Sequence, residues 1–376
     1  MLTLPDNLTP DSFLQKYWQK QPLHMPRALE RLQPSMTRNE LAWLATHDDV
    51  ESSIVFIDRS ATSSHYRVES GPFDTEFLQN LPKRDWTLLI HDVEKHIPAM
   101  RAVLQVVPFI PDWRVDDLMV SFAAPGGGVG PHRDHYDVFL CQGIGIRNWC
   151  FTAEHVDDNP HASDDLALLQ EFSGEAINAS EGDVLYIPPG VAHWGVAERA
   201  CMTYSIGMRA PQACDLSFML ECKTHDDEAF YCDPGLMSNE AIPGYISNAA
   251  AHRAMAMLGL QDARRDEVAR TLGQFATRPK EWLKPDGVKA DEIDSILRHW
   301  RNGGKLELHG MAQVAYDDRH LFLNGEYRLL PAMYKEKLLD LCRQREFSGN
   351  ACDDDDVLRT VAWMLEQGAF EIPDIS

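Results

Sequence analysis

The chain has 376 residues, 44% of them hydrophobic and 25% charged, a composition that suits a globular protein of two or three domains. Its formal net charge of −23, from 35 basic and 58 acidic residues, disfavours contact with nucleic acid or an anionic membrane and favours a basic partner, although acidic surfaces also serve solubility. The eight cysteines form no C-x-x-C pair, so neither a zinc ribbon nor a redox motif is indicated, and no secretory signal and no apolar run long enough for a membrane span are visible. These features favour a reducing cytoplasm.

The first half of the chain predicts one amphipathic helix followed by short strands. Residues 10–20 carry Phe13, Leu14, Tyr17 and Trp18 at helical spacing. Beyond residue 115, runs rich in Val, Leu, Ile and Phe predict strands at 116–124, 136–142, 147–152, 183–187 and 202–208. A glycine loop, Pro125–Pro131, separates the first two. Short strands between glycine and proline turns favour an all-β barrel or sandwich.

The second half changes after Pro211, where helical patterns replace strands up to about Trp300. Residues 301–304 are interpreted as a linker. Short strands with an Asn324-Gly325 turn and helices near 332–343 and 355–367 follow, which is a winged-helix-like pattern. The run Asp353–Asp356 is interpreted as a helix cap rather than a metal site. We expect a β-rich domain at 1–210, a helical region at 211–300 and a winged-helix-like domain at 301–376.

The strongest chemical signal follows the glycine loop, in the sequence PHRDHYDVF. If this segment is a strand, His132 and Asp134 share a face, because strand side chains alternate. A histidine beside a carboxylate supplies two ligands of the facial triad that holds non-haem iron(II) and leaves other positions open. His193, presented by the turn after Pro188-Pro189-Gly190, is the candidate third ligand.

Four other H-x-D sequences compete with this one, because the chain has 15 histidines and many aspartates. We interpret three of these histidines as surface residues, because they lie in acidic segments or at helix ends: His47, His155 and His225. His135 is three residues after His132 and would face the opposite side of the strand. The alternation of strand side chains alone does not decide between the pair His132 and Asp134 and the pair His135 and Asp137. The position of His132 directly after the glycine loop favours the first pair.

Two motifs together are more specific than either alone: Gly126-x5-His132-x-Asp134 and, some sixty residues later, Gly182-x5-Pro188-x-Gly190-x2-His193. The pair resembles the signature motifs of the cupin superfamily in its JmjC-type oxygenase branch. The segment FLQKYWQKQPLHMPRA resembles the W-x-K-x-P segment of that branch. The sequences DDLMVSFAAPGGGVGPH, YDVFLCQG, YIPPGVAH and YSIGMRAP resemble the bacterial ribosomal oxygenase group. The specific resemblance covers residues 10–211, and the later segments match by pattern only.

The resemblance implies the fold class α+β: a double-stranded β-helix (the cupin or JmjC barrel), a helical region that mediates dimerisation, and a winged-helix-like C-terminal domain. It implies Fe(II), 2-oxoglutarate and O2 as cofactors, with His132, Asp134 and His193 as catalytic metal ligands. Arg147 matches the family's basic residue for the distal carboxylate of 2-oxoglutarate, and a planar guanidinium suits a carboxylate. Ser121 and Ser205, on strands expected to line the same cavity, are further candidates for binding the co-substrate, although a plain strand serine is the simpler interpretation.

The resemblance also implies a reaction, the hydroxylation of a large-subunit ribosomal protein with release of succinate and CO2. The bacterial layout favours an arginine of the basic protein L-sixteen, and a homodimeric cytoplasmic enzyme that contacts no nucleic acid and no membrane. The related eukaryotic enzymes hydroxylate histidine, and the motifs do not separate the two residues. Two alternatives stay open: a metal-dependent cupin enzyme without 2-oxoglutarate, and a non-catalytic binding protein. The acidic tail from Lys305 onward disfavours DNA binding.

Overall fold

The computed structural model describes residues 2–5, 8–30, 32–60, 63–224, 226–330, 335–349 and 354–371. The chain divides into two compact units. The first contains residues 1–108, 115–209 and 234–238, and the second contains 109–114, 210–233 and 239–376. Because this grouping joins the helices after residue 210 to the C-terminal part, the three-part division at 210 and 300 stays a prediction. Among the described residues, no helix combines the length and apolarity that crossing a membrane requires.

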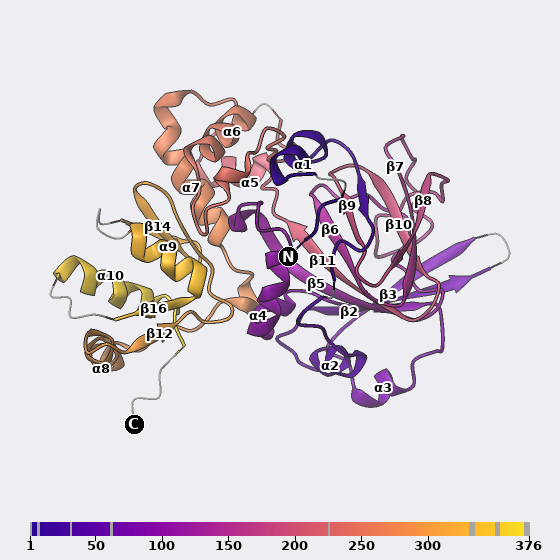
Figure 1. Ribbon diagram of the computed structural model, residues 1–376, viewed down its shortest axis with the longest axis horizontal. Helices are drawn as coiled ribbons and strands as arrows, with labels where there is room; N and C mark the ends of the chain where they lie inside the picture. Colours follow the sequence, from indigo (N-terminus) through magenta and orange to yellow (C-terminus); the bar gives the residue numbers. More distant parts are fainter. Residues whose placement is uncertain are drawn as a thin grey trace. The chain divides into compact units, whose positions relative to one another are not determined.

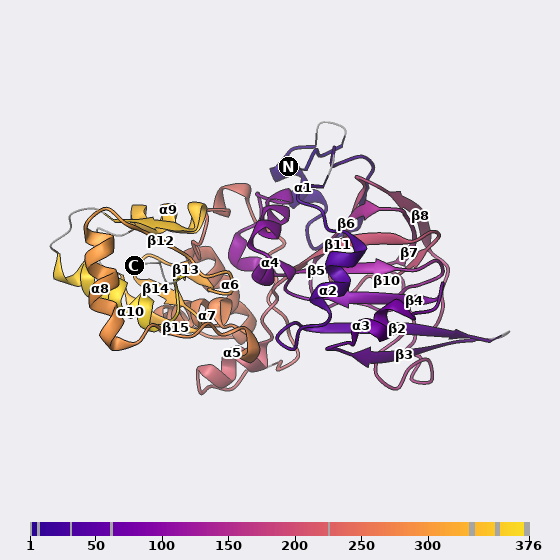
Figure 2. The same ribbon diagram turned by 90° about the horizontal axis from the view of Figure 1, so that it is seen from below.

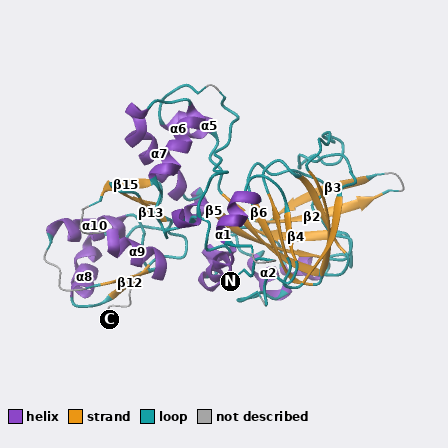
Figure 3. Ribbon diagram, turned by 45° about the horizontal axis from the view of Figure 1, so that its top comes forward, coloured by secondary structure: helices purple, strands orange, loops and turns teal. Residues whose placement is uncertain are grey.

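The first unit is built on two antiparallel sheets (strands orange in Figure 3). The larger has the strand order β1-β9-β6-β11-β5-β4-β2-β3. Its strands are β1 Leu23–Met25, β2 Ser52–Arg59, β3 Ser64–Ser70, β4 Trp86–Ile90, β5 Val115–Ala123, β6 Val138–Ile144, β9 Val184–Ile187 and β11 Cys201–Met208. The smaller has the order β10-β7-β8, with β7 Ile146–Thr152, β8 Glu175–Ser180 and β10 Ala192–Ala197. The helices of this unit are α1 Pro10–Lys16, α2 Arg38–Leu44, α3 Thr75–Gln79 and α4 Val93–His96.

The two sheets face each other across an apolar core (Figures 1 and 2). Leu140 on β6 and Leu185 on β9 belong to the same buried cluster as Trp149 and Phe151 on β7. Residues two apart on a strand share a face, so each strand sends alternate side chains into this interior. The arrangement confirms the expected double-stranded β-helix.

Helix α1 covers the outer face of the larger sheet. The ring of Phe13 lies 5.2 Å from that of Tyr186 on β9 and 5.8 Å from that of Phe139 on β6, measured between centroids. Trp18 stacks on Tyr186 at 5.9 Å. These aromatic contacts explain why apolar side chains recur at helical spacing near the N-terminus, and they seal the sheet from water on that side.

The second unit is helical at its start and mixed toward its end. Its elements are α5 Ala213–Met219, α6 Asn248–Leu258, α7 Arg265–Thr277, α8 Ala290–Arg301, β12 Lys305–Glu307, β13 Val314–Tyr316, β14 His320–Leu323, β15 Glu326–Leu329, α9 Lys335–Gln344, β16 Glu346–Ser348 and α10 Asp355–Glu366. The glycine at 273 lets α7 pack against the Phe322 ring of β14, because any side chain there would overlap the ring. The Asn324-Gly325 turn joins β14 to β15 as predicted. Asp354 caps α10, and Asp353 lies outside the described residues.

The structure corrects several strand predictions. The strand expected at 136–142 begins only at Val138. Strands β2, β3 and β4 precede residue 115, and β8 and β10 lie within the barrel, yet none of them was predicted. The sequence of β8, EAINAS, is mostly polar because five of its six residues lie partly or fully exposed on the edge of the smaller sheet. That of β10, AHWGVA, includes a glycine and a histidine, which weaken a strand pattern.

The glycine loop runs beside β10 at a distance that excludes side chains. The amide of Gly126 donates to the carbonyl of Ala197 at 2.7 Å, and the amide of Ala197 donates to the carbonyl of Gly127 at 2.9 Å. A Cβ on Gly128 would lie 2.5 Å from the carbonyl oxygen of Gly195, and one on Gly127 would overlap the carbonyl of Trp86. The run of glycines therefore lets the backbone lie against both β10 and β4.

We expect Gly127→Ala to lower the free energy of unfolding by about 1–3 kcal/mol, because backbone must move to admit the methyl group. Gly235→Ala is the matched control, since nothing lies within 4 Å of a Cβ at that position. Urea unfolding of both variants checks this. Equal stabilities would show that the glycine loop tolerates side chains.

Candidate metal centre

Two segments sixty residues apart meet through their backbones at the mouth of the barrel. The amide of His132 donates to the carbonyl of His193 at 3.0 Å, and the amide of His193 donates to the carbonyl of His132 at 2.8 Å. The amide of Gly190 donates to the carbonyl of Asp134 at 2.8 Å. These bonds fix the turn before β10 against the residues that follow the glycine loop.

The sequence argument for His132 and Asp134 used a regular strand, and the structure corrects it. His132 forms an isolated β-bridge with His193, and residues 133–137 form no strand. Asp134 nevertheless lies on the same side as His132, with its Oδ1 3.8 Å from Nε2 of that histidine. His193 is the second residue of β10 rather than part of the turn before it.

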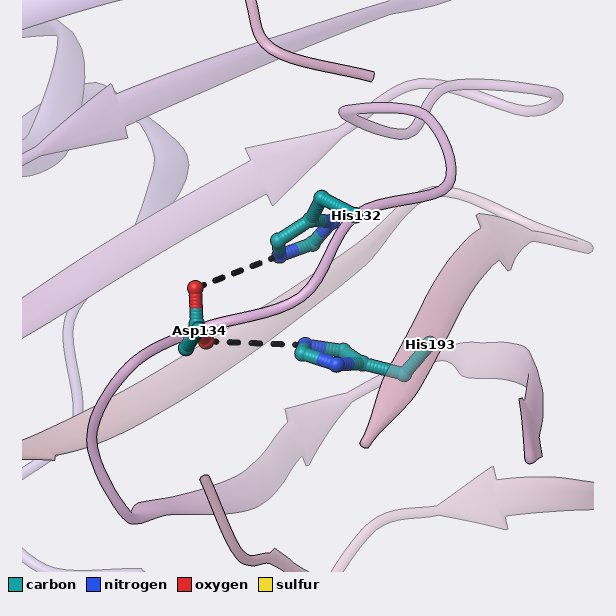
Figure 4. A group of neighbouring side chains, drawn as sticks. All are labelled: His132, Asp134 and His193. Atoms are coloured by element: carbon teal, nitrogen blue, oxygen red, sulfur yellow. Dashed lines mark ion pairs between the residues drawn. The ribbon is translucent and has the colours of Figure 1, made fainter. Parts of the chain in front are cut away.

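Three side chains converge at this point (Figure 4). Nε2 of His132 lies 3.8 Å from Oδ1 of Asp134, and Nε2 of His193 lies 3.6 Å from Oδ2 of Asp134. Among the described residues they form the one His, Cys, Asp or Glu group whose ligand atoms all lie within 4.8 Å of one another. Two nitrogens and one carboxylate on one side of a point are the donor set that a non-haem iron(II) ion takes.

Both histidines are oriented by their second ring nitrogen. Nδ1 of His132 lies 3.0 Å from the carbonyl oxygen of Gly130, and Nδ1 of His193 lies 3.0 Å from that of Val191. A carbonyl only accepts, so each Nδ1 carries the hydrogen when the ring is neutral and each Nε2 keeps a lone pair. Backbone carbonyls are common outer partners of metal-bound histidines, so both rings are prepared for a cation.

The three groups differ in exposure. The side chains of His132 and Asp134 are 24% and 18% exposed, whereas that of His193 is 2% exposed. Burial, reinforced by the nearby His132, lowers the pKa of His193 to about 4 although Asp134 opposes the shift. His193 is therefore neutral at physiological pH, which is the form that binds a metal.

The other H-x-D sequences do not form such a group in the described part of the chain. His47 packs against Trp43, and Nδ1 of His47 lies 2.9 Å from the Trp43 carbonyl oxygen. His155 pairs with Asp157 at 3.1 Å on the surface, where both side chains are exposed. His225 lies outside the described residues.

Asp137 has a structural position behind the metal centre. Its side chain is fully buried, and it accepts hydrogen bonds from the hydroxyl of Tyr186 at 2.5 Å and from Nε2 of Gln19 at 2.8 Å. It therefore ties the loop after Asp134 to β9 and to the N-terminal segment. His135 and Asp137 are thus not a second metal pair.

Arg147 lies inside the barrel, deeper than the metal centre. On β7 it pairs with Ala197 of β10, and His193 pairs with Phe151, so the two residues are four positions apart, about 13 Å along the strand direction. The guanidinium lies 5.5 Å from the ring of Trp149. Its Nε and one Nη are buried without a hydrogen-bond partner. A buried guanidinium with unsatisfied donors is costly unless an acceptor binds it, and a carboxylate is the natural acceptor.

Ser121 and Ser205 face the same interior. Ser205 pairs with Leu140 of β6 and with Met119 of β5, and Ser121 pairs with Thr203 of β11. Both are buried, and the hydroxyl of Ser121 lies 3.5 Å from the Thr203 carbonyl oxygen. The structure thus places both serines on the interior wall of the barrel.

The rim of the centre is acidic and aromatic, a feature that the sequence did not locate. A Cβ on Gly207 would lie 3.0 Å from Oδ1 of Asp117 and 3.8 Å from the ring of Tyr136, so both groups lie over this glycine. Burial of the hydroxyl, together with the charges of Asp134 and Asp117, raises the pKa of Tyr136 above its usual range. Asp117 could have been found from its place four residues before Ser121, on the same strand face.

The residues present fit a metal and a dicarboxylate. His132, Asp134 and His193 would hold the ion on one side. The orphaned nitrogens of Arg147 lie farther along the interior, where they suit the far carboxylate of an elongated co-substrate such as 2-oxoglutarate.

Comparison with known proteins agrees with this geometry. Residues 102–216 match the JmjC domain family, and residues 255–371 match the ROXA-like winged helix family. The chain is 40% identical over 208 residues to the ribosomal protein uL16 3-hydroxylase of Escherichia coli, covering 54% of this chain and 53% of that one. It is 36% identical over 346 residues to the probable ribosomal oxygenase of Haemophilus influenzae, covering 86% and 83%.

Solved structures are similar over the whole length. The X-ray structure of E. coli YcfD has a TM-score of 0.72 and 26% identity, and the match covers 99% of each chain. The structure described as the E. coli ribosomal oxygenase YcfD with cobalt and 2-oxoglutarate has a TM-score of 0.69 and 28% identity, also over 99% of each chain.

We expect His193→Ala to weaken binding of Co²⁺ more than about 100-fold, because losing a ligand should cost more than the 10–100-fold typical of an outer partner. His155→Ala is the matched control, since His155 also lies in an H-x-D pair but is exposed. Calorimetric titration with Co²⁺ measures both. An unchanged affinity in His193→Ala would remove His193 from the ligand set.

Proposed function

The chain belongs to the JmjC-type ribosomal oxygenases, and from this premise we propose that it hydroxylates an arginine side chain of the large-subunit ribosomal protein uL16. Oxygenases of this family use iron(II), 2-oxoglutarate and O2. The observation that carries the proposal is the convergence of His132, Asp134 and His193 in a barrel whose interior also holds an unsatisfied arginine.

Each residue of the centre has a part in the proposed reaction. Bound iron(II) and 2-oxoglutarate supply the oxidation, in which one atom of O2 enters succinate and the other enters a C–H bond of the substrate. His132, Asp134 and His193 would hold the ion and leave its other positions to co-substrate and oxygen. Arg147 binds the distal carboxylate through its two free nitrogens, and Ser121 and Ser205 line the path between. The buried interior excludes water and orients the reactants.

The acidic rim supports an arginine as the substrate. A guanidinium that enters beside the metal meets the carboxylate of Asp117 and the ring of Tyr136, which suit hydrogen bonds and stacking respectively. Asp116, one residue earlier, is already bound by the guanidinium of Arg209 at 2.9 Å. The net charge of −23 further favours a basic protein over an RNA backbone.

The proposal extends to assembly and place. One matching relative is named as a ribosomal protein hydroxylase and the other as a probable ribosomal oxygenase, so we place the enzyme in the cytoplasm, where ribosomes are made. We also propose a homodimer formed through the region 211–300, where the described large apolar side chains Phe218, Met237, Ile242 and Trp282 are exposed. Direct contact with nucleic acid is not part of the proposed activity.

The test is to incubate the protein with iron(II), 2-oxoglutarate, O2 and the large-subunit ribosomal proteins of its own organism. We expect one oxygen atom to be gained on an arginine of uL16, with no gain when 2-oxoglutarate is left out or in His132→Ala. Mass spectrometry of each ribosomal protein locates the change. A gain on a histidine would overturn the choice of residue, and turnover without 2-oxoglutarate would favour a cupin enzyme of another type.

We expect Asp117→Asn to lower kcat/KM for uL16 by about 10- to 100-fold, because a hydrogen bond to a charged group contributes roughly 1.5–3 kcal/mol. The KM for 2-oxoglutarate should stay unchanged, since Asp117 lies at the rim and not beside Arg147. Asp157→Asn, on the exposed surface, is the control. Steady-state kinetics with uL16 and with 2-oxoglutarate check this. A raised KM for 2-oxoglutarate with an unchanged kcat/KM for uL16 would contradict the role of Asp117 in binding uL16.

A further inference from the structure

A short segment between β4 and β5 forms hydrogen bonds with the strand that carries Asp117. Residues 91–95 leave β4 and enter the four-residue helix α4, and three of their side chains contact three consecutive residues of β5. Nδ1 of His91 lies 3.0 Å from Oδ2 of Asp117. The ammonium of Lys95 donates to the carbonyl of Asp116 at 3.3 Å. The amide of Leu118 donates to Oε2 of Glu94 at 3.0 Å.

These side-chain contacts take the place of strand pairing along residues 116–118 of β5. β4 pairs with β5 only from Val120 to Ala123, so residues 116–118 have no partner strand on that side. The side chains of Glu94 and Lys95 supply the missing acceptor and donor. Without them the first residues of β5 would be held from one side only, by β11.

The charges of this segment are buried, which makes the arrangement costly to keep for stability alone. Glu94 and Lys95 are almost completely inaccessible, and Lys95 forms ion pairs with Asp92 and, at 3.8 Å, with Glu94. Replacing buried ion pairs by apolar side chains is often neutral or stabilising, so their presence favours a role in fixing one backbone conformation. Burial raises the pKa of Glu94 to about 7, with Asp117 adding to the shift and Lys95 opposing it.

The contact with His91 is different in kind, because it reaches the carboxylate itself. It engages Oδ2 of Asp117, whereas Oδ1 lies over Gly207 beside the Tyr136 ring. Oδ2 of Asp117 is thus held by His91, while Oδ1 faces Gly207 and the ring of Tyr136. Rotation of the carboxylate away from the metal centre would break the bond to His91.

We propose that residues 91–95 are a positioning device for Asp117: Glu94 and Lys95 fix the backbone of β5, and His91 fixes the carboxylate that receives the basic side chain of the substrate. This inference rests on the proposed function, because it gives Asp117 a substrate to bind. His91, Glu94 and Lys95 are positioning residues, since they act through Asp117.

The main test compares two substitutions of His91 with purified uL16 as substrate. His91→Ala removes the contact, and we expect the KM for uL16 to rise about tenfold while kcat and the KM for 2-oxoglutarate change less than twofold. His91→Asn keeps an amide nitrogen near the place of Nδ1, and we expect it to restore the KM for uL16 to within about twofold of wild type. His91 is partly exposed, so neither variant should endanger folding. An unchanged KM in His91→Ala, or equal losses in both variants, would overturn the proposal.

Backbone amide exchange gives a second measurement that needs no substrate. Glu94→Ala should raise the exchange rate of Leu118 at least tenfold, whereas Glu94→Gln keeps an acceptor and should leave it near that of wild type. Equal exchange rates of the Leu118 amide in Glu94→Ala and in the wild type would refute the positioning role of residues 91–95. If wild-type protein fails to hydroxylate uL16, the proposed function falls, and this exchange experiment decides the positioning role without it.

Discussion

The structure of the centre depends on the close approach of the glycine loop to β10. Between Gly126 and His132 the chain follows β10 from Ala197 back to His193, joined by backbone hydrogen bonds at both ends. Bulkier residues at 127 and 128 would push the loop away from β4 and β10, and His132 would lose its bridge to His193. The candidate metal ligands are thus positioned by main-chain hydrogen bonds between the glycine-loop segment and β10.

A buried guanidinium without hydrogen-bond partners for two of its nitrogens distinguishes the interior of the barrel from an ordinary apolar core. Most buried polar groups in proteins are hydrogen-bonded, so the unsatisfied nitrogens of Arg147 indicate a site that a ligand completes. Asp137 shows the opposite case, because its two oxygens are satisfied by Tyr186 and Gln19. One buried charged group is thus suited to binding, and the other holds the loop of Asp134 in place.

In the proposed function, substrate specificity and reactivity come from different walls of the same barrel. The metal ligands lie on the glycine-loop segment and β10, while Asp117 lies on β5, across the interior and gripped by residues 91–95. Separation of this kind lets the substrate wall vary without disturbing the metal. It also explains why motifs that identify the chemistry do not identify the residue that is hydroxylated.

The sequence by itself determined the chemistry and the class of fold. Two motifs named His132, Asp134 and His193, and short apolar-rich runs predicted strands close to β5, β7 and β11. Local patterns could not find β10, whose glycine and histidine serve the glycine loop and the centre rather than strand propensity. Nor could they place Asp134, which lies outside any strand, or Asp117, whose partners His91 and Gly207 are distant along the chain. Only the tertiary structure decided these, because each depends on backbone segments that meet after long excursions of the chain.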